Sequence, residues 1–424
     1  MLQIVKADGL AEQEALTAIR NRTAETGARI QAAAAEIMDS VRKNGFQAVE
    51  AYALQFDGAA PREIAAEEWE AAVSRCPKEL YHALERAVSN IRDYQTRLLQ
   101  KTQTWNSPDG GLVGCLVRGL TRVGIYVPGG RAAYPSSVLM NAVPAKVAGV
   151  KEIIMVTPPT EHFSDAVLTA AKLAGVDRVF AVGGVQAVAG LTYGAGILPK
   201  VDKLVGPGNA YVAAAKRIAY GDLDIDMVAG PSEVLVIADA NANPKYVAAD
   251  LLSQAEHDVM ASAILLTDSA SLAQAVTEEI AQQMAYLPRR EIIAASLRDF
   301  GVAIVCQSLE EAAHLANEIA PEHLEVLTEA PEELLPLLHN AGAIFLGAYS
   351  PEPLGDYMAG PDHVLPTSGT ARFFSPLSVE SFLKRTSLIS YDKPSLAKVK
   401  DSILTLAQAE GLSAHANAIA VRFD

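Results

Sequence analysis

The feature that most constrains the fold is an alternation of short apolar segments with alanine-rich segments between residues 123 and 346. The apolar segments have the length and β-branched composition of buried strands, and the alanine-rich segments have the composition of helices. Such an alternation predicts βαβ units, in which helices cover both faces of a parallel sheet. The expected strands form a first series, 123–127, 153–156, 178–182 and 203–205, and a second series, 233–238, 261–267, 302–306, 324–327 and 343–346. We therefore predict an α/β protein with two doubly wound, Rossmann-like parallel-sheet domains.

Smaller units are expected on either side of these two domains. Residues 1 to about 105 are rich in Ala, Glu and Arg and are punctuated by glycines, which is typical of helices. The run Asn-Ser-Pro-Asp-Gly-Gly at 106–111 then breaks that pattern. We expect an N-terminal helical segment, 1–21; a larger α/β domain built from 22–105 and 229–366; an inserted α/β domain, 106–228; and a C-terminal tail domain, 367–424. The tail is too small to bury a core of its own, so we expect it to pack on a neighbour such as a second subunit.

The composition excludes several classes of function. Half of the 424 residues are hydrophobic and a fifth are charged, which indicates a compact enzyme-like protein. The net charge is −15 and Lys and Arg are not clustered, which argues against nucleic-acid binding. The chain shows no signal-peptide pattern at its start and no apolar run long enough to cross a bilayer. Its three cysteines are scattered without a CxxC pair, so we expect a reducing, cytoplasmic location and no membrane partner.

Glycine-rich turns follow three of the first expected strands: Pro-Gly-Gly at 128–130, Gly-Gly at 183–184 and Gly-Pro-Gly-Asn at 206–209. Ligands of doubly wound sheets bind outside the carboxyl ends of the strands, where these turns are expected. The last turn lacks the third glycine of a GxGxxG motif, and the sequence contains no Walker A loop and no nucleophile elbow. A dinucleotide that binds here therefore does so without the usual fingerprint.

Glu322 and His323 are adjacent and follow Pro321. At a tight turn or helix start, two neighbouring side chains can face one cavity, and a carboxylate beside an imidazole suits proton transfer. The plainer interpretation is an ordinary helix start, with Pro321 at the first helical position. The pair alone does not decide between these two interpretations.

Other histidines and acidic residues occur in contexts that could converge on this pair. Gln254 and His257 are three positions apart in an expected helix, so they share one helix face, and their oxygen and nitrogen atoms suit a divalent metal such as zinc. An exposed polar helix end is the plainer interpretation. The remaining candidates are Asp356, Asp362 and His363 in a segment rich in Gly and Pro, and Glu410 and His415 in the tail.

These segments, taken in order, resemble the histidinol dehydrogenase family over nearly the whole chain. The matching segments are 126–130, 181–187, 206–209, 226–233, 253–258, 320–325, 360–369 and 410–415. The resemblance implies a homodimeric enzyme that depends on zinc, one ion per subunit, and on NAD. It also implies the last step of histidine biosynthesis, a four-electron oxidation of L-histidinol through histidinal to L-histidine with two NAD.

The resemblance also implies roles for individual residues. His323 would be the general base and Glu322 would activate water, both in the larger domain, while the inserted domain would contact NAD. The zinc ligands would be Gln254, His257, Asp356 and His415, the last supplied across the dimer interface. The substrate contacts would be Ser232, Gln254, His257, His323, Asp356, His363, Glu410 and His415. The NAD contacts would be Tyr126, Gln186 and Asn209.

Two alternatives to this function stay open at this point. The first is the same zinc and NAD chemistry on another small polar alcohol, such as a sulfonated diol. His363 and Glu410 favour a substrate with an imidazole and an amine, because a carboxylate attracts a cationic amine and repels a sulfonate. The second is a metabolite-binding protein without catalysis. The Glu322–His323 pair argues against it, because binding alone needs no poised base.

Overall fold

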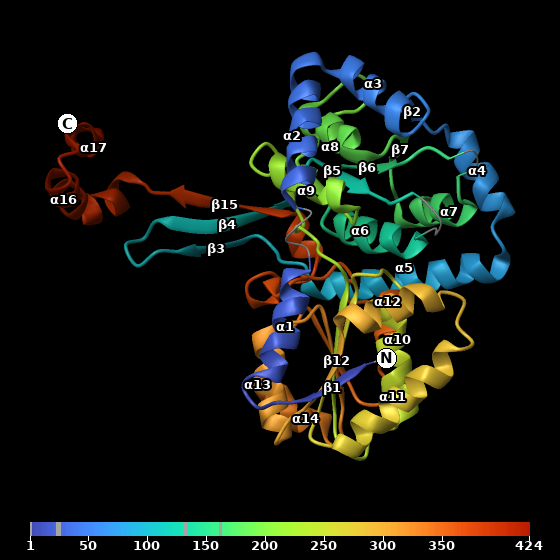
Figure 1. Cartoon of the computed structure of the whole chain (residues 1–424). Helices are drawn as coiled ribbons and strands as arrows, with labels where there is room; N and C mark the ends of the chain where they lie inside the picture. Colours follow the sequence, from blue (N-terminus) through green and yellow to red (C-terminus); the bar gives the residue numbers. More distant parts are fainter. Residues whose placement is uncertain (1, 23–26, 130–133, 161–162) are drawn as a thin grey trace.

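The computed structural model describes every residue of the chain except 1, 23–26, 130–133 and 161–162. Within the described residues, the strands form two sheets of parallel or mainly parallel strands and a small antiparallel sheet (Figure 1). The predicted α/β class with two parallel sheets is thereby confirmed. No helix of the described part is both long enough and apolar enough to cross a membrane.

The first sheet, which we call sheet A, is built mainly from the second half of the chain. Its strands are β1 (Gln3–Lys6), β10 (Glu233–Ala238), β11 (Ser262–Thr267), β12 (Gly301–Val305), β13 (His323–Leu327) and β14 (Ala343–Leu346). They lie side by side in the order β1-β12-β11-β10-β13-β14, and every neighbouring pair is parallel. From β10 the chain builds outward to β12 and then returns to β13 on the other side, which is the order of a doubly wound sheet.

Helices cover both faces of sheet A, and this explains why its strands are apolar without alternation. Val234 and Val236 of β10 pack into one hydrophobic core, whereas Leu235 and Ile237 pack into another on the opposite face. The helices are α1 (Ala11–Asn21), α10 (Pro244–Ala255), α11 (Ala270–Met284), α12 (Arg290–Phe300), α13 (Leu309–Ile319), α14 (Pro331–Leu334) and α15 (Glu352–Tyr357), with short 3-10 turns η1 (Leu335–Leu337) and η2 (Thr370–Arg372).

The second sheet, sheet B, is built mainly from the middle of the chain. Its strands follow the same topological order as those of sheet A. Its strands are β2 (Arg62–Glu63), β5 (Arg122–Tyr126), β6 (Glu152–Thr157), β7 (Arg178–Ala181), β8 (Lys203–Val205) and β9 (Asp224–Ile225). The order is β2-β7-β6-β5-β8-β9, with only the edge strand β2 antiparallel within the described residues. Its helices are α2 (Gly27–Asn44), α3 (Phe46–Phe56), α4 (Ala66–Arg75), α5 (Lys78–Leu98), α6 (Pro135–Val147), α7 (Asp165–Ala174), α8 (Gly184–Tyr193) and α9 (Ala210–Ala219).

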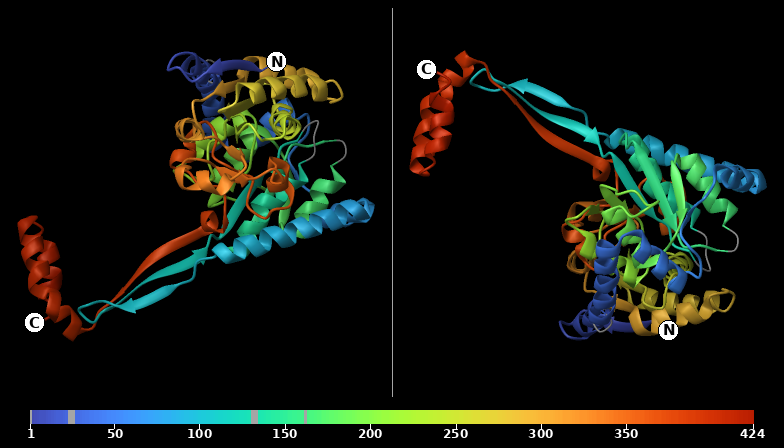
Figure 2. Two further views of the ribbon diagram at one scale, coloured as in Figure 1. Left: turned by 90° about the horizontal axis from the view of Figure 1, so that it is seen from below. Right: turned by 90° about the horizontal axis from the view of Figure 1, so that it is seen from above.

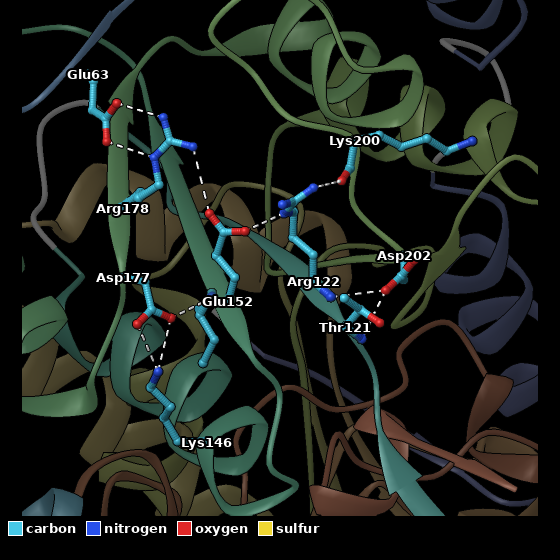
Figure 3. Close-up of polar contacts among 10 residues, drawn as sticks. Glu63, Thr121, Arg122, Lys146, Glu152, Asp177, Arg178, Lys200 and Asp202 are labelled. Carbon is cyan, nitrogen blue, oxygen red and sulfur yellow. Dashed lines mark hydrogen bonds and ion pairs between the residues drawn. The ribbon is translucent and has the colours of Figure 1, made fainter.

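The amino end of sheet B is lined by ion pairs (Figure 3). Arg122, Glu152 and Arg178 are the first residues of β5, β6 and β7, and Glu152 lies 2.5 Å from Arg122 and 3.7 Å from Arg178. Arg178 also pairs with Glu63 of β2 at 2.7 Å. These side chains are partly exposed, so each pair adds little to stability. The ion pairs occupy the amino end of the sheet. The glycine-rich turns lie at the opposite, carboxyl end, where a ligand is expected.

A long arm projects from the two packed sheets (Figures 1 and 2). Its elements are β3 (Gln103–Asn106), β4 (Leu112–Gly119) and β15 (Leu383–Ser390), with α16 (Lys393–Ala409) and α17 (Ser413–Ala420) at its tip. The 3-10 turn η3 (Val379–Phe382), just before β15, packs into the core beside sheet B. Strands β15, β4 and β3 form the antiparallel sheet. Large apolar side chains on the arm are exposed, including Trp105, Ile389, Leu406 and Val421. The arm therefore does not bury its own apolar surface.

Two local predictions are wrong. Residues 3–6 were expected in a helical segment but form β1, because they pair with β12 at the edge of sheet A. The second is the possible helix start at Pro321: α13 ends before it, with Ala320 at φ 52°, and strand β13 begins at His323. Pairing of β13 with β10 and β14 overrides the local helix-start pattern. The domain boundaries stay a prediction.

Candidate functional site

A cavity of 540 Å³ lies where the carboxyl end of sheet B faces the amino end of sheet A. Sheet B contributes Pro128 after β5 and the turn 206–208 after β8. Sheet A contributes Ser232 just before β10 and His323 at the start of β13. The cavity therefore lies at the carboxyl end of sheet B, whereas sheet A presents the opposite ends of its strands.

Glu322 and His323 lie in this cavity, and both are held by the backbone of one residue, Glu233. The N–H group of Glu233 donates to Glu322 Oε2 over 2.9 Å, and the carbonyl oxygen of Glu233 lies 3.0 Å from His323 Nδ1. A carbonyl oxygen can only accept, so Nδ1 carries the hydrogen and Nε2 of the neutral ring has a free lone pair. Both side chains are almost fully buried. The arrangement leaves one imidazole nitrogen, Nε2, without a hydrogen bond to any described residue, and the carboxyl group of Glu322 lies 3.7 Å from the other nitrogen, Nδ1.

Burial shifts the pKa of the two groups in opposite directions. It raises the pKa of Glu322 well above its usual value, and the nearby carboxylates of Glu233, Asp356 and Glu352 add to this rise. Burial lowers the pKa of His323 to about 4, although the negative charge of Asp356 opposes the shift. His323 is therefore neutral at physiological pH and able to accept a proton.

Gln254 and His257 reach the cavity from the end of α10. Gln254 is in the last turn of the helix, and His257 lies just beyond it, where its N–H donates to the carbonyl of Gln254. The two side chains line the same cavity, as expected, although His257 is not on the helix itself. The amide oxygen of Gln254 is buried and has no hydrogen-bond partner among the described residues. A buried amide oxygen without a partner is costly, and a bound cation would satisfy it.

Asp356 and His363 form an ion pair at the rim of the same cavity. Asp356 Oδ1 lies 3.4 Å from His363 Nδ1. Burial acts to raise the pKa of Asp356, but the hydrogen bond and charge of His363 outweigh it and bring the pKa to about 2. Burial acts to lower the pKa of His363, and Asp356 in turn raises it above its usual value. Asp356 is thus a carboxylate at neutral pH, as a metal ligand must be.

Glu352 is a site residue that the sequence did not reveal. It lies one helical turn before Asp356 on α15, and its Oε1 is 4.0 Å from His323 Nε2. Ligand atoms of His323, Glu352 and Asp356 all lie within 4.8 Å of one another. Burial raises the pKa of Glu352 to about 9, and Asp356 adds to the shift. Its spacing to Asp356 is a signal only once residues 352–357 are known to be helical.

The donor atoms around the cavity fit a divalent metal such as zinc. An orphaned amide oxygen from Gln254, an imidazole from His257 and a carboxylate from Asp356 are the nitrogen and oxygen ligands that zinc accepts. These three fill three positions of a tetrahedral set and leave the fourth position open.

The structure does not bring Glu410 and His415 to the cavity within one chain. Glu410 caps α16 and His415 is on α17, so both are exposed at the tip of the arm (Figure 1).

The expected NAD contacts lie near the glycine-rich turns but do not line the cavity. Tyr126 is buried, and its hydroxyl accepts from the N–H of Gly184 over 3.0 Å. Gln186 is buried and donates to Asp57 over 3.1 Å. Asn209 caps α9. Their role toward NAD stays a prediction, and Gly130 of the first turn lies outside the described residues.

The turn at 206–208 lines the cavity, and a buried ion pair holds its first residue in place. Asp226 Oδ2 accepts from the N–H of Gly206 over 2.8 Å, and Lys216 Nζ donates to the carbonyl oxygen of Gly206 over 2.9 Å. Lys216 and Asp226 also pair with each other. Gly206 has φ +106°, and a Cβ there would lie 2.2 Å from the carbonyl oxygen of Tyr126, so only glycine fits. The turn is thus a rigid part of the cavity wall.

Comparison with known proteins gives one consistent family. The family model described as histidinol dehydrogenase matches residues 20–423. A histidinol dehydrogenase from Clostridium acetobutylicum is 50% identical over 427 residues, which cover 100% of this chain and 99% of the relative. One from Heliobacterium mobile is 54% identical over 403 residues, covering 94% of each. The crystal structure of histidinol dehydrogenase from Elizabethkingia anophelis superposes with a TM-score of 0.93 at 36% identity, covering 100% of this chain and 98% of that one.

Proposed function

Because the chain belongs to the histidinol dehydrogenase family, we propose how its own residues carry out the last step of histidine biosynthesis, the oxidation of L-histidinol to L-histidine. The observation that carries the proposal is the pairing of a buried, neutral His323 with Glu322 on the backbone of Glu233. When bound, NAD accepts a hydride in each oxidation step, and zinc anchors nitrogen atoms of the substrate. The remaining chemistry belongs to the side chains.

In the first oxidation, His323 is the general base. Its bare Nε2 takes the proton of the substrate hydroxyl while the carbon gives up its hydride, so the alcohol becomes the aldehyde histidinal. The hydrogen bond between Nδ1 and the carbonyl of Glu233 keeps the ring in the tautomer that can do this. It also fixes the ring plane, and a well-oriented base is the more effective one.

Glu322 acts between the two oxidations, when the aldehyde must add water. As a carboxylate it takes a proton from the water whose oxygen bonds to the aldehyde carbon. The proton that His323 gained in the first oxidation passes to the former carbonyl oxygen, which gives the hydrated aldehyde and restores the neutral imidazole. A raised pKa makes the carboxylate a stronger base once it is ionised. His323 then takes a hydroxyl proton of the hydrate as the second hydride leaves, and the product is the carboxylic acid.

Gln254, His257 and Asp356 are the residues of one chain that would hold the zinc, and His415 of a second copy would complete the set. Ser232 and His363 line the same cavity and would contact the substrate, together with Glu410 from the second copy. The carboxylate of Glu410 would pair with the cationic amine of histidinol. This attraction between opposite charges favours histidinol over an anionic alcohol as the substrate.

The exposed arm supports a homodimer in which each tail enters the site of the other chain. A second cavity, of 640 Å³, lies on the other side of His323, Asp356 and His363. Much of its wall is apolar, including Ile344, Phe345 and Leu377. The arm tip carries matching exposed apolar side chains, so a partner's tail would cover this wall and bring His415 to the metal.

The assignment of activity is tested by the formation of NADH from L-histidinol, followed by absorbance with and without a chelator. We expect two NADH per histidinol and loss of activity after chelation that added zinc restores. Comparison with a sulfonated diol separates the two kinds of substrate. Binding of histidinol by the zinc-loaded protein without NAD reduction would favour the non-catalytic alternative.

Replacing His257 by Asn is expected to weaken the affinity for zinc by at least roughly 10- to 100-fold. Loss of a residue that only hydrogen-bonds to a metal ligand already costs about that much. The imidazole nitrogen is a direct ligand in the proposed site, so its loss should weigh more. Metal analysis after dialysis measures the effect without relying on activity. His314→Asn, at an exposed position of α13, is the matched control and should keep its zinc. Undiminished zinc in His257→Asn would refute the ligand assignment.

Mixing two inactive variants, His415→Asn and His323→Asn, is expected to restore part of the activity. A hybrid dimer has one site in which both the His323 of one chain and the His415 of the other are intact. Activity after subunit exchange is the measurement, with each variant alone as the control. If exchange is demonstrated and no activity returns, the tail acts within its own chain.

A further inference from the structure

Arg22 lies directly behind the catalytic pair, although nothing in its local sequence marks it. It follows α1, and its side chain is 3% exposed. Its Nη2 atom donates to Glu233 Oε1 over 2.7 Å and to the carbonyl oxygen of Pro231 over 3.0 Å, and Nη1 donates to the carbonyl of Ile19 over 3.2 Å. One guanidinium therefore joins the end of α1 to two residues at the start of β10.

The segment held by Arg22 is the same one that holds the catalytic pair. Glu233 uses its side chain for Arg22, its N–H for Glu322 and its carbonyl oxygen for His323. Ser232, between the two residues that Arg22 contacts, lines the cavity. The backbone of 231–233 thus runs between Arg22 on one side and the reacting groups on the other.

We propose that Arg22 is a positioning residue for catalysis: its fork holds the backbone of residues 231–233, and that backbone orients Glu322 and His323. The inference deepens the proposed function and rests on the roles given there to Glu322 and His323. Arg22 itself does not line the cavity that holds the substrate-binding candidates. It acts only through its contacts with Pro231 and Glu233.

The physical reason is that a buried ion pair tolerates little displacement. Arginine is planar and always charged, so its contacts with Glu233 and Pro231 fix both direction and distance. Without Arg22, the buried carboxylate of Glu233 has lost its cationic partner and must take up a proton or turn towards water. Either change moves the first residue of β10. A shift of about 1 Å in groups that orient a reaction can cost roughly 100-fold in rate.

A second ion pair, with a buried cation and an exposed carboxylate, provides a control for effects on stability alone. Lys203 is buried at the start of β8 and pairs with Asp224 over 2.8 Å. It lies at the amino end of sheet B, whereas the cavity lies at the carboxyl end. Lys203→Met should lower the melting temperature and leave kcat unchanged.

The first measurement is the split between kcat and KM in Arg22→Met. We expect kcat to fall roughly 10- to 100-fold, with a much smaller change in KM for histidinol and with zinc content unchanged, because the metal ligands are on other segments. Arg22→Lys keeps the charge but not the fork, so it should recover part of the loss. A normal kcat in folded Arg22→Met would overturn the proposal.

The second measurement is a double-mutant cycle with Glu322→Gln, assayed on the oxidation of histidinal. If Arg22 acts by orienting Glu322 and His323, its replacement should cost clearly less, about threefold or under, once the Glu322 carboxylate is gone. The same fold loss in both backgrounds would show a merely structural role and overturn the proposal. Where Arg22→Met does not fold, Glu233→Gln takes its place, because it removes the ion pair and keeps the shape of the side chain.

The outcomes also separate this inference from the proposed function. Unchanged rates in both Glu322→Gln and His323→Asn would overturn the roles of these residues and, with them, the role of Arg22. A different result would overturn the positioning role alone. In that result, Glu322→Gln and His323→Asn are impaired, but Arg22→Met costs the same fold in rate with and without Glu322→Gln.

Discussion

His323→Asn is expected to slow both oxidation steps by roughly 100- to 10,000-fold, the range that one well-placed general base contributes. Asparagine is the informative replacement because its amide N–H can take the place of Nδ1–H in the bond to the carbonyl of Glu233. The variant therefore removes Nε2, the proposed base, and keeps the local hydrogen bond. The rates are measured separately with histidinol and with histidinal by NADH formation.

Zinc content and melting temperature should stay near their original values in this variant, since His323 is not among the proposed ligands. His339→Asn, at an exposed position remote from the cavity, serves as the control. A loss of less than tenfold in both steps would contradict the assignment of His323 as the base. A loss confined to one step would contradict its use in both.

The pH dependence follows from the lowered pKa of His323. Burial brings this pKa to about 4, so the neutral, proton-accepting form prevails at every pH clearly above that value. Protonation of His323 should therefore not reduce the rate of histidinol oxidation between pH 6 and about pH 8. A fall in rate on acidification through pH 6 that disappears in His323→Asn would contradict this expectation.

Glu322→Gln is expected to impair the conversion of histidinal to histidine far more than the conversion of histidinol to histidinal. Glutamine keeps an oxygen that can accept from the N–H of Glu233, so the backbone contact survives while the basic carboxylate is lost. The aldehyde step should fall by about 100-fold or more, as for loss of a general base. Equal losses in the two half-reactions would contradict the division of work between Glu322 and His323.

The raised pKa of Glu322 also predicts the direction in which the rate of the aldehyde step changes with pH. A carboxyl group activates water only when ionised, and burial means that ionisation requires a higher pH than for an ordinary glutamate. The rate of the aldehyde step should therefore rise with pH in the native enzyme. This rise should be absent in Glu322→Gln, because an amide does not titrate.

Much of the fold was available from local pattern. Unbroken apolar runs such as 234–238 and 153–156 predict strands buried on both faces, because an exposed face would have required alternating polar residues. The structure places these runs in β10 and β6, at the centre of sheets A and B. The pattern failed at residues 3–6 and at Pro321, where pairing with a distant strand decides the conformation.

The sequence by itself determined the types of group that could do the chemistry: an adjacent Glu322 and His323, a glutamine and a histidine near one helix end, and an Asp and a His in a segment rich in Gly and Pro. These are visible because side-chain chemistry and short spacings belong to the chain. Only the tertiary structure decided that Glu322 and His323 are held by Glu233, 89 and 90 positions away, with Arg22 behind Glu233 and Glu352 beside His323. Such contacts depend on which strands pair and which ends of the two sheets meet. That choice is set by the burial of whole faces, not by any local run of residues.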